Sequence, residues 1–120
     1  MKKILIVEDV EFNLDLLVQL LEDQYQLLVA RDGISGVETA LNEHPDLVLM
    51  DMSLPGMDGW EATRRLKSDQ ALKSTPVIGL SAHAMDGDKE KALSSGCDDY
   101  LTKPVDEDKL YAKLKFFLGE

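Results

Sequence analysis

The chain has 120 residues, of which 44% are hydrophobic and 30% are charged, a composition typical of a globular protein rather than of a disordered one. Its 13 basic and 23 acidic side chains give a net charge of −10, which repels phosphate backbones and anionic lipids and argues against direct binding to nucleic acids or membranes. No apolar run approaches the roughly 20 residues of a membrane helix, so we expect one cytoplasmic domain over residues 1–120.

Five short apolar runs along the chain have the length of β-strands. They are nearly continuous rather than alternating, which is typical of strands covered on both faces within a parallel sheet. The runs lie at residues 4–7, 27–30, 47–50, 77–80 and 100–101.

Between these runs the apolar residues recur with the period of a helix. The first helix is indicated by Leu14, Leu17, Val18 and Leu21, which share one helical face. A second helix ends before Pro45, a third covers residues 59–67, and a fourth follows Ser81. Their apolar faces, and that of a fifth helix, are marked by Ile34, Val37, Leu41, Ala62, Leu66, Met85, Ala92, Leu93, Leu110, Leu114, Phe117 and Leu118. This alternation predicts an α/β fold, a doubly wound parallel sheet with helices on both faces.

Polar residues follow the predicted strands, at the edge where ligands bind in open α/β sheets. Glu8 and Asp9 follow the first run, Asp51 the third, Ser81 the fourth, and Lys103 comes just after the fifth. Three crowded carboxylates repel one another unless a cation offsets them. Because Cys97 is the only cysteine, a metal must bind to oxygen, and Mg²⁺ suits such a site.

The same residues suit a phosphoryl group. Magnesium and the Lys103 ammonium together balance three carboxylates, and Ser81 adds a hydroxyl donor for phosphoryl oxygens. A carboxylate can attack phosphorus to form an aspartyl phosphate, so Asp51 is the predicted nucleophile.

These motifs resemble the receiver domains of bacterial two-component systems, the family of the chemotaxis response regulators. The resemblance covers nearly the whole chain and rests on ILIVED at residues 4–9, LMDMSLPGMDG at 49–59 and YLTKP at 100–104. Residues 8–13, with Gly96 and Cys97, are most similar to stand-alone cell-division regulators and hybrid-kinase receivers. The resemblance implies a flavodoxin-like (βα)5 fold with strand order 2-1-3-4-5.

The resemblance also implies the role of each site residue. Glu8, Asp9, Asp51 and the backbone carbonyl of Ser53 would place Mg²⁺, for which Mn²⁺ can substitute. Asp51 would receive phosphate from a phosphohistidine of a histidine kinase or phosphotransfer protein. Glu8 stands where the family more often has aspartate, and its extra methylene predicts contact with the metal through a water.

Switching residues follow from the same resemblance. Ser81 would bond a phosphoryl oxygen, Lys103 would pair with it, and Tyr100 would turn inward, changing the face formed by the fourth helix, fifth strand and fifth helix. A downstream protein, or a second copy in a phosphorylation-dependent homodimer, would read that face. The Lys103–Pro104 peptide is expected to be cis, and no output domain is expected after the last helix.

Two other functions are compatible with part of this sequence. An aspartate-nucleophile phosphohydrolase would need a second aspartate where Ser53 stands, so we expect no enzyme activity beyond self-phosphorylation and self-dephosphorylation. A phosphorylation-independent binding module would not need Asp51, Ser81 and Lys103 together. His83, near the predicted site, is a candidate for tuning dephosphorylation.

Overall fold

The computed structural model describes residues 1–54, 56–81, 90, 94 and 96–120. Five parallel strands form one sheet in the order β2-β1-β3-β4-β5, which confirms the predicted fold class and strand order. The strands are β1 (Lys3–Val7), β2 (Gln26–Ala30), β3 (Leu47–Asp51), β4 (Val77–Ser81) and β5 (Asp99–Thr102).

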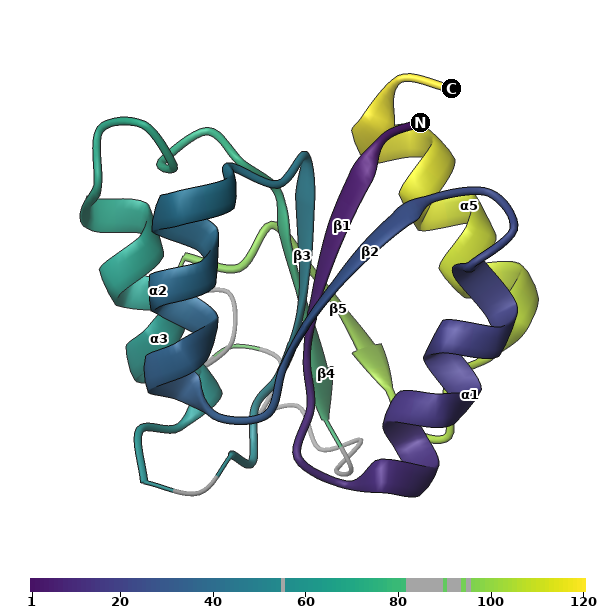
Figure 1. Ribbon diagram of the computed structural model, residues 1–120, viewed down its shortest axis with the longest axis horizontal. Helices are drawn as coiled ribbons and strands as arrows, with labels where there is room; N and C mark the ends of the chain where they lie inside the picture. Colours follow the sequence, from purple (N-terminus) through teal and green to yellow (C-terminus); the bar gives the residue numbers. More distant parts are fainter. Residues whose placement is uncertain (55, 82–89, 91–93, 95) are drawn as a thin grey trace.

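Helices cover both faces of the sheet. One face carries α1 (Glu11–Leu21) and α5 (Glu107–Leu118), and the other carries α2 (Gly33–Glu43) and α3 (Gly59–Ser68) (Figure 1). The helix predicted after Ser81, with Met85, Ala92 and Leu93, lies outside the described residues, as does His83. Within the described part of the chain, no helix is both long and apolar enough to cross a membrane.

The core is divided by the sheet into two layers. Alternate residues of β1 point to opposite sides: Ile4 and Ile6 pack with α1 and α5, whereas Leu5 and Val7 pack in the layer under α2 and α3. All four side chains are fully buried. Burial on both faces explains why the sequence of this strand is continuously apolar rather than alternating.

The strands extend slightly beyond the apolar runs, and this places two polar residues inside the sheet. Asp51 and Ser81, expected after their strands, are instead the last residues of β3 and β4. The ladder continues past them, because Met52 N–H donates to the carbonyl of Leu80 and Lys103 N–H to that of Ser81. Both side chains are therefore held on rigid strand backbone.

A hydrogen-bonded clamp joins α3 to the amino-terminal ends of β4 and β5. Lys67 Nζ donates to the carbonyl oxygen of Thr75 and to Asp98 Oδ2, each at 2.7 Å. The same Asp98 oxygen accepts the N–H of Val77 at 2.8 Å. The ion pair fixes the loops before β4 and β5, at the end of the sheet opposite to Asp51.

Candidate functional site

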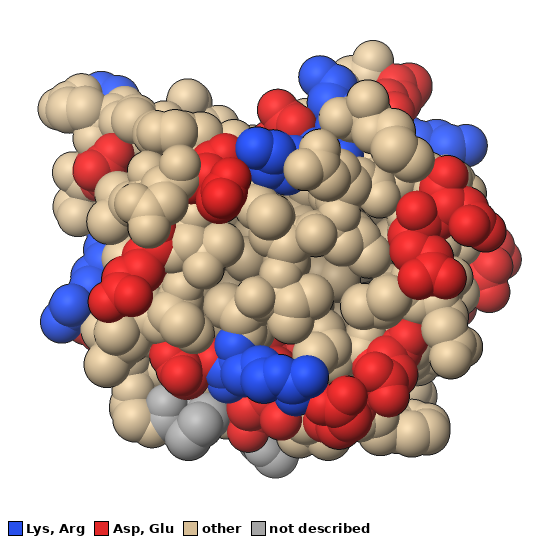
Figure 2. All heavy atoms as spheres, viewed as in Figure 1, with Lys and Arg blue, Asp and Glu red and all other residues tan. Residues whose placement is uncertain are grey.

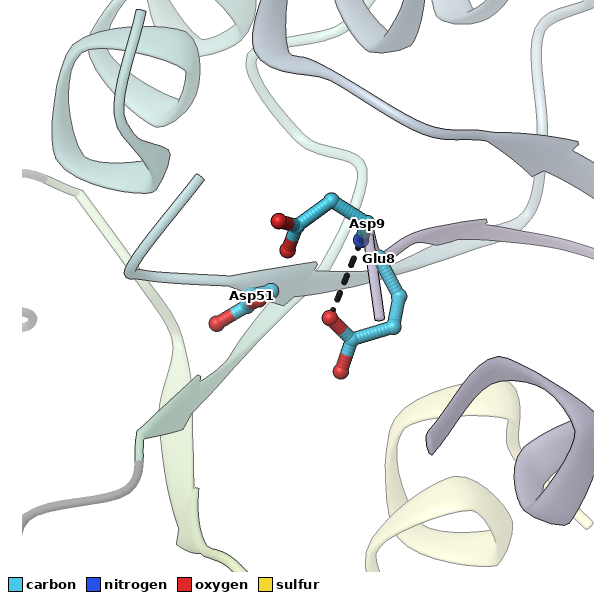
Figure 3. Close-up of side chains that lie close together, drawn as sticks. All are labelled: Glu8, Asp9 and Asp51. Atoms are coloured by element: carbon cyan, nitrogen blue, oxygen red, sulfur yellow. Dashed lines mark hydrogen bonds between the residues drawn. The ribbon is translucent and has the colours of Figure 1, made fainter. Parts of the chain in front are cut away.

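Acidic side chains from two strands converge at the carboxyl end of the sheet. Glu8 and Asp9 follow β1, and Asp51 ends β3, next to β1 in the sheet. One carboxylate oxygen of each lies within 4.8 Å of the others. Figure 3 shows the carboxylates of Asp9 and Asp51 on the same side of the strands, while Glu8 curves back toward the backbone of Asp9.

Glu8 is fully buried, and the protein engages both of its oxygens. Oε2 accepts the backbone N–H groups of Asp9 at 3.0 Å and of Val10 at 3.3 Å. Oε1 accepts from Lys103 Nζ at 2.6 Å. A buried carboxylate needs such partners, because burial without them costs several kcal/mol.

Asp51 is also buried, with 2% of its surface exposed, and its Oδ1 atom has one hydrogen bond and one ion pair. The backbone N–H of Ser53 donates to it at 3.0 Å, and Lys103 Nζ lies 3.3 Å away. Lys103 therefore stands between the two buried carboxylates, closer to Glu8 than to Asp51. The sequence predicted that Lys103 lies in the site, but it did not predict that Lys103 lies closer to Glu8 than to Asp51.

The two buried carboxyl groups differ in acidity. Burial raises the pKa of Glu8 to about 7, Asp51 acts in the same direction, and Lys103 only partly opposes them. Burial would also raise the pKa of Asp51, but hydrogen bonds with Glu8 and Ser53 and the charge of Lys103 outweigh it and lower that pKa. Asp51 is thus kept ionised, as a nucleophile must be.

Ser81 and Tyr100 lie on the neighbouring strands β4 and β5, and β4 pairs with β3, which ends in Asp51. Ser81 is buried at the end of β4, and its carbonyl oxygen accepts Lys103 N–H at 2.7 Å, which places Lys103 at this edge. Tyr100, in β5, is half-buried against the core layer under α2 and α3. The Lys103–Pro104 peptide, for which the resemblance implied a cis bond, is cis in the structure.

Gly59 has a role that the sequence did not reveal. It begins α3, and a Cβ atom there would meet the backbone of Asp51 and Met52. The side chain of Asp58 caps the same helix by accepting the N–H of Glu61 at 2.9 Å. In the sequence, a glycine next to a helix cap indicates only a turn. No sequence pattern predicts that the start of α3 packs closely against the backbone of Asp51.

The carboxylates suit a hard divalent cation. Their spacing allows shared oxygen ligation, and Asp9, unlike Glu8 and Asp51, is exposed at the edge. Figure 2 shows Asp and Glu side chains gathered along the lower edge of the molecule, where the strands end in Figure 1. Ser53 is exposed, and ligation by its carbonyl oxygen remains a prediction.

Comparison with known proteins agrees with this geometry. The protein-family model described as the response regulator receiver domain matches residues 4–115 of this chain. The polar-differentiation response regulator DivK of Brucella ovis is 39% identical over 120 residues, which cover 99% of this chain and 98% of the relative.

Solved structures show the same architecture. The receiver domain of the sensor histidine kinase PA1611 from Pseudomonas aeruginosa, with a magnesium ion coordinated in its active-site cleft, is 35% identical with a TM-score of 0.92, covering 99% of this chain and 98% of that one. The chemotaxis protein CheY4 of Vibrio cholerae is 25% identical with a TM-score of 0.92, covering 98% and 99%. This chain therefore belongs to the response regulator receiver domain family.

Proposed function

We propose that this protein is a phosphoacceptor switch in which Asp51 takes a phosphoryl group from a phosphohistidine, with Mg²⁺ required. The observation that carries the proposal is the buried, ionised Asp51 carboxylate, with the Lys103 ammonium 3.3 Å from Oδ1. Residues 1–120 are proposed to act as one receiver domain, in the cytoplasm.

In the proposed reaction, a carboxylate oxygen of Asp51 forms a bond to phosphorus as the bond from phosphorus to the donor imidazole nitrogen breaks. The electron pair of the breaking bond stays on that nitrogen, and the product is an acyl phosphate on Asp51. Catalysis of such a transfer is mainly positioning and charge compensation. Lys103 supplies a positive charge beside Asp51, and the Ser81 hydroxyl is proposed to donate to a phosphoryl oxygen.

Magnesium, or manganese in its place, would supply positive charge that offsets the carboxylates and the incoming phosphoryl oxygens. Its proposed ligands are among Glu8, Asp9, Asp51 and the carbonyl oxygen of Ser53. The magnesium in the PA1611 receiver domain supports this assignment, since that domain is 35% identical to this chain.

The phosphodonor is proposed to be a histidine kinase or a histidine phosphotransfer protein. The phosphorylated form would be read by a downstream protein, or by a second copy, through the face that contains β5 and α5. Ser81 and Tyr100 would couple the site to that face, because they lie on adjacent strands. The similarity to the stand-alone regulator DivK supports signalling through protein contacts rather than through nucleic acid.

An enzyme acting on outside phosphate esters is less well supported. Residue 53 is serine and exposed, so the site has no carboxylic acid at the position where such enzymes place a second aspartate. We propose turnover only of the protein's own phosphoryl group.

Asp51→Asn tests the proposal. Wild-type protein incubated with acetyl phosphate and Mg²⁺ should gain the mass of one phosphoryl group in intact-mass spectrometry, and the Asn variant should gain none. Asp23→Asn, at an exposed position, is the matched control and should be labelled like the wild type. A phosphoryl adduct that persists in the Asp51→Asn protein would rule out Asp51 as the acceptor.

A further inference from the structure

An open cavity lies between the first turns of α2 and the loop that precedes α3, on the face of the sheet away from α1 and α5 (Figure 1). Its volume is about 470 Å³, within the range of roughly 300–1,000 Å³ that is usual for binding pockets. The described residues that line it include none of those assigned to the phosphorylation site. They are Asp32, Ile34, Ser35, Glu38, Gly56 and Met57.

Close packing holds the two walls of the cavity together. Asp32 caps α2, because its side chain accepts the N–H of Ser35 at 2.7 Å. A Cβ atom built on Gly33 would collide with the carbonyl oxygen of Met57, so the loop before α3 rests directly on the first turn of α2. The cavity is therefore already formed in the free protein, and an occupant would not have to order its walls.

The outer face of α2 is apolar at and beyond this cavity. Ile34 is 56% exposed and lines the cavity, and Leu41 is 40% exposed and lies seven residues further along the same helical face. Met57 adds a half-buried side chain from the loop. Apolar residues at this spacing are typical of surfaces that bind an amphipathic helix, which presents its own apolar side chains at i, i+3 or i+4, and i+7.

The cavity also carries negative charge that no lining cation balances. Asp32 and Glu38 both line it, and none of the described lining residues is Lys or Arg. The neighbouring Arg31 is paired with Glu11 at the start of α1. Hydrogen bonds from Ser35 lower the pKa of Asp32, so its carboxylate is ionised at neutral pH. An occupant with Lys or Arg beside its apolar residues would therefore match the cavity in charge.

The same charge argues against other occupants. A second copy related by twofold symmetry would bring its own Asp32 and Glu38 against those of the first, and each chain has a net charge of −10. Nucleic acids and anionic lipid surfaces have the same sign of charge as the cavity. A basic protein segment is the occupant that matches both the charge and the apolar pattern.

We propose that this cavity and the outer face of α2 form a docking site for an amphipathic helical segment of a partner protein, with apolar residues flanked by Lys or Arg. The apolar residues of the segment pack on Ile34 and Leu41, and its basic residues lie against Asp32 and Glu38. The inference goes beyond the function proposed above, because binding at this surface needs no phosphoryl group and does not use the face that contains β5 and α5.

NMR titration of the unphosphorylated, magnesium-free protein tests the site. The probe is a synthetic peptide of about 14 residues, or four helical turns, with leucine at i, i+4 and i+7 and lysine on either side. The same peptide with glutamate in place of lysine is the charge control. Amide shift changes should saturate and centre on α2 and Gly56, and the glutamate peptide should bind about tenfold more weakly or worse. Shift changes centred elsewhere, equal binding of the two peptides, or no saturable binding would overturn the proposal.

Substitutions at exposed positions locate the binding surface. Ile34→Lys removes an apolar contact and adds a repelling charge, so it should weaken binding of the lysine peptide by about tenfold or more, the scale of a hot-spot residue. Phe116→Lys makes the same kind of change on α5, where Phe116 is 75% exposed, and is the matched control that should stay within about twofold of the wild type. Equal losses in the two variants would show that affinity follows net charge alone.

Glu38→Gln keeps the size of the side chain and tests the charge separately. It should weaken binding of the lysine peptide by about threefold or more, whereas Glu107→Gln, at an exposed position of α5, should not. An unchanged affinity in Glu38→Gln would contradict the role of the cavity carboxylates.

Sedimentation equilibrium decides between a partner segment and a second copy. The unphosphorylated wild-type protein should be monomeric at the concentrations used for the titration. Self-association that Ile34→Lys abolishes would mean that another copy covers this surface, and the proposal would be wrong. Labelling of Asp51 by acetyl phosphate should be the same in Ile34→Lys as in the wild type, so failure of the docking site and failure of the proposed function are distinguishable.

Discussion

A Cβ atom built on Gly59 lies 2.3 Å from the backbone oxygen of Asp51, too close for any side chain at position 59. Gly59→Ala should therefore push the start of α3 away from the end of β3, which carries Asp51. We expect a loss of about 1–3 kcal/mol in the free energy of unfolding, the usual cost of overpacking, measured by urea denaturation. Labelling of Asp51 by acetyl phosphate should also slow down.

Gly56→Ala is the matched control. Gly56 has a φ of 70°, and apart from Gly56 itself and its chain neighbours, no heavy atom of the described residues lies within 4 Å of its built Cβ atom. Alanine there carries only the conformational cost of a left-handed residue, about 1 kcal/mol. If Gly59→Ala costs no more than Gly56→Ala, the close approach to Asp51 is not a significant constraint.

Stability of the metal-free protein should fall as pH rises from about 4.5 to about 7. The pKa of Glu8 is raised from 4.5 to about 7 in the folded state, so in this window the folded protein binds more protons than the unfolded chain. The whole pKa difference of Glu8 between the folded and unfolded states corresponds to a change on the order of 3 kcal/mol in the free energy of unfolding. The contribution of Asp51 depends on pH with the opposite sign. Because its pKa is lowered in the folded state, Asp51 stabilises the fold fully only at pH values above its ordinary pKa, and this stabilisation is lost in acid.

Urea denaturation at several pH values, in the presence of a chelator, checks this expectation. Glu8→Gln cannot titrate, so its stability should change much less over the same window. A difference in stability between wild type and Glu8→Gln that stays constant from pH 4.5 to 7 would show that the Glu8 carboxyl is not a buried, weakly acidic group.

Lys67→Met should destabilise the fold without directly altering the chemistry of the site. The substitution keeps most of the apolar stem but removes the donors to Thr75 and Asp98, in a side chain that is only 17% exposed. Loss of charged hydrogen bonds should cost about 2–3 kcal/mol by urea denaturation. Arg64→Met removes an exposed ion pair with Glu61 and should cost no more than about 0.5 kcal/mol; equal costs would refute a structural role for the clamp.

Tyr100→Ala should separate phosphorylation from its structural consequence. Tyr100 is half-buried in β5, and its neighbour across the sheet is Gly79 rather than a site residue. Labelling at Asp51 should stay within about twofold of the wild-type rate, while phosphorylation-induced NMR shift changes in β5 and α5 should shrink. Shift changes of full size in the variant would exclude Tyr100 as the coupling residue.

Much of the fold could be predicted because burial leaves a periodic trace in the sequence. Continuous runs such as residues 47–50 marked strands covered on both faces, and the spacing of Leu14, Leu17 and Leu21 marked α1. Parallel topology then brought Glu8, Asp9 and Asp51 to one edge, because every strand ends on that side.

Other features depend on distances that no local pattern encodes. Whether Lys103 bonds more closely to Glu8 or to Asp51 is decided by differences of less than 1 Å between side chains from separate strands and loops. The contact of Gly59 with β3 depends on how closely α3 packs on the sheet. Lys67 and Asp98 form a pair although they are 31 residues apart in the sequence, and no periodic pattern predicts this pair.

The position of the Lys67 clamp has a consequence for sequence divergence. Its anchors lie at the amino ends of β4 and β5, while the carboxylates gather at the opposite rim of the same sheet. A loss of stability caused by substitutions at the carboxylate rim can therefore be compensated by stronger packing at the other rim, without the two sets of residues touching. Residues of the site can therefore diverge in sequence while contacts at the opposite end of the sheet keep the fold stable.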